Sequence, residues 1–194
     1  MTSNRRLGAE DSATRTALLD AALGLMAEEG YAAVTSRRVA ARAELKPQLV
    51  HYYFRTMDDL FLALVRRGAE RNLERQAKAL ASDQPLRALW ALGTDPTATT
   101  LNTELAALAN HRKAIRSEIG AYAEQFRRQQ LDALTRVLEG HGIDKALPPP
   151  AFLMVLSSVA RVLGMESALG VVTGHDEVEA LVEDFLSRIE GPAR

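Results

Sequence analysis

Residues 35–54 read TSRRVAARAELKPQLVHYYF, and the class of the fold is most evident here. The first two residues, Thr and Ser, are good N-caps for a short helix over residues 37–43. Pro47 then begins a second short helix that runs to Phe54. Proline lacks a backbone N–H, but the N–H of the first helical residue has no partner within the helix, so proline is favoured at this position. Two short helices joined by a turn have the geometry that sets the second helix into the major groove of DNA. The stretch therefore predicts a helix-turn-helix.

Basic residues are concentrated in this region, although the chain as a whole is not basic. Lys plus Arg number 24 and Asp plus Glu number 25, so affinity for nucleic acid requires a local basic patch. Between residues 31 and 57 the only acidic residue is Glu44, and it is opposed by Arg37, Arg38, Arg42, Lys46 and Arg55. The alternative is an ordinary solvated face, with residues 51–54 packed in a core.

The sequence outside this stretch predicts helices and shows no alternating strand pattern. Residues 1–10 are polar and aperiodic, which indicates a mobile tail. Helical periodicity then predicts helices over residues 11–29, 58–81, 111–139, 151–169 and 176–190, with a short helix at 86–92 flanked by turns. We therefore expect an all-α fold of about nine helices.

Several classes of chemistry find no support in the sequence. The absence of cysteine excludes disulfides and thiolate sites, and the four histidines form no metal-ligand motif. There is no glycine-rich phosphate loop, nucleophile elbow or clustered acid pair, so we expect no cofactor, no metal and no enzymatic activity. The longest charge-free apolar stretch, residues 146–160, is shorter than the roughly 20 residues of a membrane helix. We expect a soluble, cytoplasmic protein without a membrane partner.

The central stretch and its neighbours closely resemble the DNA-binding region of the TetR family. The resemblance covers about residues 17–60 and is carried by Gly30-Tyr31, by TSRRVAARA at 35–43, by LKPQLVHYYF at 45–54 and by Asp58-Asp59-Leu60. It implies a helix-turn-helix domain over residues 11–56 and a ligand-binding and dimerisation domain over residues 57–194. It also implies a transcriptional regulator that binds double-stranded operator DNA as a homodimer.

The resemblance assigns roles to individual positions. Ser36 matches a residue that contacts phosphate, and Arg37 matches one that reads a base in some family members. Gln48 is the best candidate for specificity, because its amide can bond N6 and N7 of adenine together. Val50 and Phe54 match core positions. The predicted DNA-binding residues are Ser36, Arg37, Arg38, Lys46, Pro47, Gln48, His51, Tyr52, Tyr53 and Arg55.

Three positions depart from the family pattern. Glu44 stands where the turn usually has glycine, which makes the turn less permissive and brings a carboxylate near the DNA. His51 replaces a tyrosine, and Met57 replaces a lysine that contacts phosphate, although Arg55 can substitute for it. These departures bear on the DNA affinity rather than on the fold.

The family resemblance also implies a dimer interface in the last two helices and an effector site in the helices before them. The predicted interface residues are Phe152, Val159, Leu163, Leu181, Phe185 and Leu186, with intramolecular core as the alternative. The effector candidates lie on the expected inward faces: Trp90, Leu101, Asn102, Leu105, Ile115, Ile119, Tyr122, Phe126, Met154 and Ser158. Plain core packing is the default for each of them. The default for Glu104 and Glu118 is a solvated helix face.

The predicted function is that of a repressor. A small hydrophobic or aromatic effector would release it from a palindromic operator, and the helix over residues 58–81 would act as the lever. One rival hypothesis is an all-α enzyme or small-molecule carrier in which the N-terminal helices only pack. A second rival is a regulator without an effector, which acts as a constitutive or architectural DNA binder.

Overall fold

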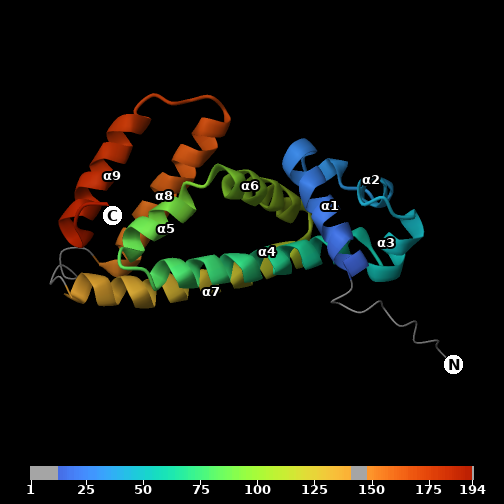
Figure 1. Cartoon of the computed structure of the whole chain (residues 1–194), viewed down its shortest axis with the longest axis horizontal. Coiled ribbons are helices and arrows are strands. Elements are labelled where there is room, and N and C mark those ends of the chain that lie inside the picture. Colours follow the sequence, from blue (N-terminus) through green and yellow to red (C-terminus); the bar gives the residue numbers. More distant parts are fainter. Residues whose placement is uncertain (1–12, 141–147, 194) are drawn as a thin grey trace. The chain divides into compact units, whose positions relative to one another are not determined.

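The computed structural model describes residues 13–140 and 148–193, and every regular element within these ranges is a helix. Nine α-helices and one short 3-10 helix lie in this part of the chain (Figure 1). The predicted all-α class is therefore confirmed. The predicted mobile tail over residues 1–10 lies outside the described residues.

The first of two compact units contains residues 13–69 and 101–120 of the described chain. It holds α1 (Ala13–Glu29), the 3-10 helix η1 (Tyr31–Ala33), α2 (Ser36–Arg42), α3 (Pro47–Tyr53), and parts of α4 (Met57–Leu80), α6 (Pro96–His111) and α7 (Lys113–Gly140). Its core combines side chains that are inaccessible to water on α1, α2 and α4, among them Leu18, Ala22, Met26, Val39 and Leu60. Burial of these apolar faces holds in place short helices that would not be stable alone.

Specific capping interactions start the helices of this unit. The side chain of Thr35 accepts a hydrogen bond from the Arg38 N–H at 3.4 Å and caps α2, as predicted. Thr56 and Asp59 form a reciprocal capping box before α4: the Thr56 N–H donates to the Asp59 carboxylate at 3.0 Å, and the Asp59 N–H donates to the Thr56 hydroxyl at 3.1 Å. Two backbone N–H groups that would otherwise lack partners are satisfied in this way.

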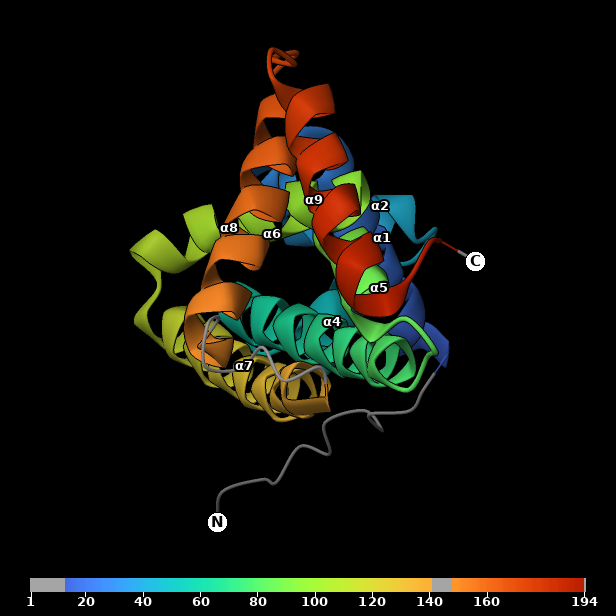
Figure 2. The ribbon, with the colours of Figure 1, turned by 90° about the vertical axis from the view of Figure 1, so that its left-hand side faces the viewer.

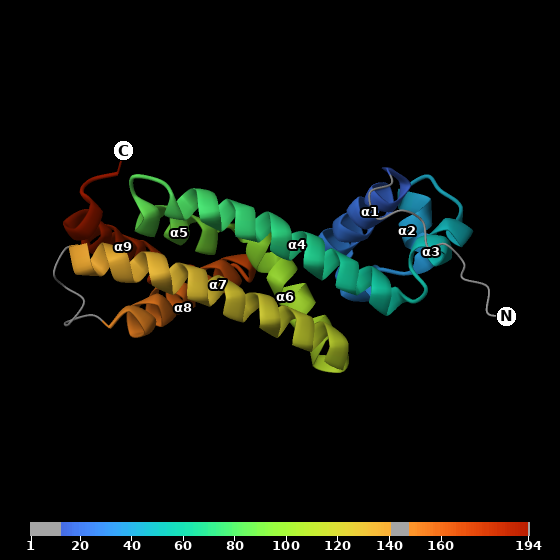
Figure 3. The same ribbon diagram turned by 90° about the horizontal axis from the view of Figure 1, so that it is seen from below.

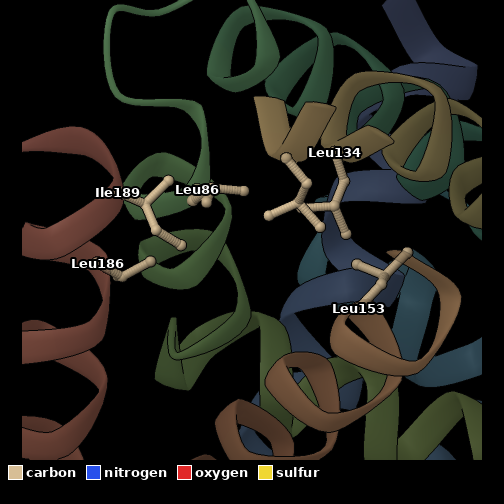
Figure 4. Packing of buried hydrophobic residues seen from close by; sticks show 6 residues of the cluster. Leu86, Leu134, Leu153, Leu186 and Ile189 are labelled. Atoms are coloured by element: carbon tan, nitrogen blue, oxygen red, sulfur yellow. The ribbon is translucent and has the colours of Figure 1, made fainter. Parts of the chain in front are cut away.

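The second compact unit contains residues 70–100 and 121–193 of the described chain. It holds α5 (Pro85–Gly93), α8 (Pro149–Ala168), α9 (His175–Glu190) and the remaining parts of α4, α6 and α7. Helix α5 packs against both α8 and α9 (Figure 2), and the C-terminal parts of α4 and α7 run side by side (Figure 3). In the core, Leu186 and Ile189 of α9 approach Leu86 of α5 (Figure 4).

Helix α6 was not predicted from the sequence. The pattern indicated turns around the helix over residues 86–92, whereas the chain re-enters a helix at Pro96. Asp95 explains this start, because its carboxylate accepts hydrogen bonds from the N–H groups of Thr97 at 3.0 Å and Ala98 at 3.4 Å. The predicted helix over 111–139 also began too early, since His111 ends α6 and α7 begins at Lys113.

Helix α8 is predominantly apolar, although it also contains serines, Arg161 and Glu166. By length and composition alone it is long and apolar enough to cross a membrane, with a mean hydropathy of 1.4. The charge-free stretch of residues 146–160 is shorter than this, because the helix also contains Arg161 and Glu166. Such a helix is weak grounds for a membrane span, and only 22% of the stretch is buried. It leaves a large apolar surface exposed.

The boundary predicted from the sequence, between a DNA-binding domain that ends at residue 56 and a ligand-binding domain that begins at residue 57, stays a prediction. The two compact units divide the chain differently, because α4, α6 and α7 each contribute residues to both of them. The first unit therefore contains more than the predicted helix-turn-helix.

Candidate functional site

The candidate site is built on α2 and α3, which pack against each other in the first unit (Figure 1). Helix α2 also packs against α1. Val50 on α3 and Phe54 after it are almost completely buried, as predicted for the residues that hold the recognition helix. The guanidinium of Arg15 on α1 lies 5.3 Å from the centre of the Phe54 ring. The short helix α3 is thus fixed on its inner side.

The turn between α2 and α3 is strained at Glu44. This residue has a φ of 55°, the left-handed region that costs a residue with a Cβ about 1–2 kcal/mol. The surrounding hydrogen bonds require that conformation: the Glu44 N–H donates to the Ala41 carbonyl at 3.1 Å, and the Leu45 N–H donates to the Ala40 carbonyl at 2.9 Å. These two bonds form a Schellman motif, which usually has glycine at this place.

The outer face of α3 is polar and exposed. Pro47, Gln48, His51 and Tyr52 recur at helical spacing on one face, and all four are exposed, as is Lys46 before them. Tyr53 is partly buried, and its ring meets the Tyr52 ring edge to face at 5.1 Å. One helix face therefore presents amide, imidazole and phenol groups to a partner.

The basic residues of α2 fall into two groups. Arg37 is exposed and makes no ion pair with any residue that the structure describes. Arg38, by contrast, pairs with Glu29, and Arg42 donates two hydrogen bonds to Glu28 at 2.6 and 2.5 Å. Hydrogen bonds from these arginines hold the pKa of each glutamate below its usual range. Both glutamates precede the basic stretch of residues 31–57, so the local charge pattern did not reveal these pairs.

Residues after α3 and on α6 and α7 complete the first unit. Arg55 is exposed, and Met57 is partly buried as the first residue of α4. The Glu104 carboxylate accepts a hydrogen bond from the Tyr31 N–H at 2.7 Å, and Glu118 pairs with Arg66 at 2.7 Å. Both glutamates are partly buried, and each has a polar partner within the chain.

Arg112, in the break between α6 and α7, contacts the first two turns of α4. It pairs with Asp58 at the start of α4, and its guanidinium lies 5.3 Å from the centre of the Phe61 ring. The break between α6 and α7 thus anchors the beginning of α4. No sequence pattern indicated this pair, because its two residues are 54 positions apart.

Most of the predicted dimer residues belong to the core of the second unit. Leu163 and Leu186 are buried, and Phe152 and Phe185 pack against each other with ring centres 5.1 Å apart. Phe152, Phe185 and Leu186 pack with residues of α5 and α7 in one core cluster, and the role of the predicted residues in a dimer stays a prediction. Val159 is partly buried, whereas Leu181 is 68% exposed. The exposed apolar side chains of α8 include Met154, Val155, Val162 and Met165.

The effector candidates are divided between the two units. In the first unit Ile115 is fully buried, Leu101, Leu105 and Ile119 are partly buried, and Asn102 is exposed. In the second unit Trp90 packs against the core, and the Tyr122 and Phe126 rings stack at 6.4 Å. Met154 and Ser158 are exposed, so the expectation of inward faces was wrong for these two and for Asn102.

A buried amide in the second unit was not anticipated. Gln76 on α4 is 7% exposed, and its Oε1 has no hydrogen-bond partner within the described residues. An unpaired buried acceptor costs about 1–3 kcal/mol unless something donates to it. Separately, a cleft of about 520 Å³ lies between α4 and α7, lined by Leu73, Glu74, Ala77, Leu80, Gln129, Asp132 and Arg136.

A second cleft lies at the start of α5. It measures about 530 Å³, and its lining includes Trp90, Arg87 and Glu183. No group of three potential metal ligands occurs within residues 13–140 and 148–193. His175 is buried and bonds to Glu166 at 3.0 Å, while His141 lies outside the described residues.

Comparison with known proteins points to one family. Residues 18–64 match the sequence profile of the family described as bacterial regulatory proteins, tetR family. The HTH-type transcriptional regulator BetI of Rhizobium meliloti (strain 1021) is 40% identical over 52 residues, which are 27% of this chain. The matched part spans about a quarter of that relative, 26% of its length.

Solved structures match over a much larger part of the chain. A transcriptional regulator from Rhodococcus sp., assigned to the TetR family, superimposes with a TM-score of 0.74 at 19% identity, covering 92% of this chain and 100% of that one. The multidrug binding protein EbrR, solved in complex with imidazole, matches with a TM-score of 0.52 at 26% identity, covering 79% and 96%. The first likeness concerns the fold alone.

Proposed function

We propose that the chain is a regulator of the TetR family, whose sequence profile its residues 18–64 match, and that it is a cytoplasmic repressor of transcription. It binds a palindromic operator as a homodimer and is released by a small hydrophobic or aromatic effector. Regulators of this family bind DNA and are not enzymes.

The proposal is supported above all by the exposed polar face of α3 beside an exposed arginine on α2. Gln48 and Tyr52 are exposed, whereas Val50 on the inner side of the same helix is buried. A recognition helix reads base edges with such exposed residues, while the helix before it crosses the phosphate backbone. In our proposal Ser36 on α2 contacts a phosphate, and Arg37 on α2 contacts a phosphate or a base. Lys46, His51, Tyr53 and Arg55 add further contacts to phosphate.

The proposed dimer uses the exposed apolar face of α8 and α9. Val155 is 62% exposed and Leu181 is 68% exposed, and a protein in water gains by covering such a surface. We assign the interface to Met154, Val155, Val162, Met165 and Leu181, with Val159 at its edge. Two reading heads in one dimer would meet half-sites about 34–36 Å apart, or a multiple of this distance.

The proposed effector site lies in the second unit. The stacked Tyr122 and Phe126 rings favour a flat aromatic ligand, and Trp90 offers a third ring. The unpaired Oε1 of Gln76 favours a ligand that also carries a hydrogen-bond donor. The multidrug binding protein EbrR, which matches this fold, was solved with imidazole bound.

Release of DNA follows from a coupling between ligand binding and DNA binding. Helices α4, α6 and α7 contribute residues to both units, so a change in one unit can reach the other through them. An effector shifts the equilibrium only by its difference in affinity for the two states. A tenfold loss of operator affinity requires about 1.4 kcal/mol of this coupling.

The proposal is tested by measuring binding to duplex DNA over a series of salt concentrations. Arg37→Ala should weaken binding at every salt concentration, because one cationic contact is lost. The matched control is Arg71→Ala, which removes the same charge from an exposed position on α4. Equal affinities of the two variants would contradict the role of α2. Absence of DNA binding by the unchanged protein at low salt would overturn the proposed function itself.

A further inference from the structure

We propose that Arg38 and Arg42 form a second phosphate-binding site of the DNA interface, which the carboxylates of Glu28 and Glu29 occupy in the free protein. Bound DNA must therefore compete with these two carboxylates. The inference rests on the proposed DNA-binding function. It gives a role to the ion pairs that hold two of the five basic residues between residues 31 and 57.

The geometry of the two ion pairs is that of phosphate recognition. Arg42 donates from both of its terminal nitrogens to the two oxygens of Glu28, at 2.6 and 2.5 Å. An arginine fork binds a carboxylate and a phosphate in the same two-pronged way. Arg38, one helical turn before Arg42 on α2, donates a hydrogen bond to Glu29. Each carboxylate thus stands in for the oxygens of a phosphate.

The position of the arginines favours contact with the DNA backbone. Arg38 and Arg42 are four residues apart and share one face of α2, the helix that crosses the backbone in helix-turn-helix complexes. Their side chains are 44% and 37% exposed, so solvent and a ligand can reach both. They are not structural groups enclosed in the core.

The glutamates lie where electrostatics alone disfavours them. Both are in the last turn of α1, at the negative end of the helix dipole, and no basic residue of α1 shares that turn. Hydrogen bonds from Arg42 and Arg38 nevertheless keep the pKa of Glu28 and Glu29 low, so both remain ionised. Exposed ion pairs of this kind contribute little to stability. Their larger effect is to neutralise two of the five basic charges that α2 and its neighbours offer to DNA.

A small space beside α1 accommodates Arg42. A Cβ added to Gly24 would lie 2.7 Å from Nη2 of Arg42 and 2.9 Å from its Cζ, closer than real atoms approach. The guanidinium therefore rests against the backbone of α1, the helix that carries Glu28. This packing positions the arginine for the carboxylate.

The test is to replace both glutamates by glutamine, Glu28→Gln with Glu29→Gln, and to measure binding to duplex DNA of random sequence and to a selected site. Glutamine keeps the size and an acceptor oxygen, so the helices should fold as before, which thermal unfolding checks. We expect affinity to rise about tenfold on both duplexes, with the salt dependence steeper by about 0.9 for each additional phosphate that the protein binds. Base preference should not change, because bonds to phosphate carry no sequence information.

Two further variants distinguish a local effect from one of net charge. Glu70→Gln with Glu74→Gln on α4 removes the same charge and should leave affinity nearly unchanged. Adding Arg38→Gln and Arg42→Gln to the first pair should abolish the increase in affinity. The inference is overturned if the first pair leaves affinity unchanged, if the control pair raises it equally, or if the increase survives loss of both arginines. Failure of the unchanged protein to bind any DNA would instead count against the proposed function.

Discussion

The carboxylate of Glu104 accepts a hydrogen bond from the backbone N–H of Tyr31 at 2.7 Å, across 73 residues of sequence. Glu104 lies on α6, and Tyr31 is the first residue of the 3-10 helix η1 that leads into the helix-turn-helix. The carboxylate also lies 3.2 Å from the place where a Cβ on Gly30 would be. A residue of α6 thus fixes the position of the chain just before α2 and α3.

Glu104→Ala should destabilise the protein by about 1–3 kcal/mol, because the partly buried Tyr31 N–H loses its acceptor. Glu104→Gln should cost less, since its amide oxygen can still accept. Denaturant unfolding measures the change in free energy, and amide exchange of Tyr31 localises it. Equal stabilities for Glu104→Ala and the exposed control Glu124→Ala would show that the bond contributes nothing.

Glu44→Gly should stabilise the protein by about 1 kcal/mol, because glycine adopts the left-handed conformation of this turn without steric cost. Glu44→Ala keeps the Cβ and removes only the charge, so it should leave stability close to that of the unchanged protein. Thermal unfolding of both variants separates strain from charge. A stabilisation by alanine equal to that by glycine would assign the effect to the carboxylate instead.

Leu181→Glu should convert the dimer to monomers, because it places a charge on the exposed apolar face of α8 and α9. Sedimentation at several protein concentrations measures the association. Ala121→Glu, an exposed position on α7, serves as the control and should leave the dimer intact. Persistence of the dimer in Leu181→Glu, with a folded far-UV spectrum, would require another interface.

Asp95 should contribute a stabilisation that disappears in acid. The hydrogen-bonded Arg75 pair, assisted by the N–H groups of Ala98 and Thr97, lowers the pKa of Asp95 below its ordinary value of 3.8. A lowered pKa in the folded state means that the contribution is complete above pH 3.8 and is lost as the pH falls through the folded value. The difference in unfolding free energy between the protein and Asp95→Asn should therefore shrink below this pH.

A difference that stays constant from neutral pH to strong acid would contradict the assignment of this stabilisation to the charge of Asp95. Asparagine is a good N-cap, so Asp95→Asn should retain α6 and lose only the ionic part. Asp95→Ala should cost more, by about 1 kcal/mol, because the cap is lost as well.

The helix-turn-helix could be predicted from sequence because its signals are local. Thr35 as cap and Pro47 as first helical residue each act within one turn of the chain, and both are found where the pattern indicated. The strain at Glu44 was also predictable, since the turn needs a conformation that glycine prefers. Local chemistry of this kind leaves a clear pattern in a single sequence.

The remaining features depend on contacts between distant residues. Glu28 and Glu29 lie outside the basic stretch, and only the packing of α1 on α2 brings them to Arg42 and Arg38. The apolar stripe that contains Phe185 and Leu186 has the same periodicity whether it faces a partner or its own core, and only the contact of α9 with α5 shows that Leu186 is buried within the chain. The start of α6 at Pro96 depended on capping by Asp95, in a segment rich in turn-forming residues.

Selection of binding sites from random duplex DNA by the purified protein is the sharpest test of DNA reading by α3. We predict enrichment of a palindrome whose half-site centres lie one helical turn, or a multiple of it, apart, with binding that weakens steeply as salt increases. Gln48→Ala should relax the preference at one position of each half-site, at a cost of about 1–3 kcal/mol. Absence of any enriched sequence at low salt would contradict the claim that α3 reads DNA.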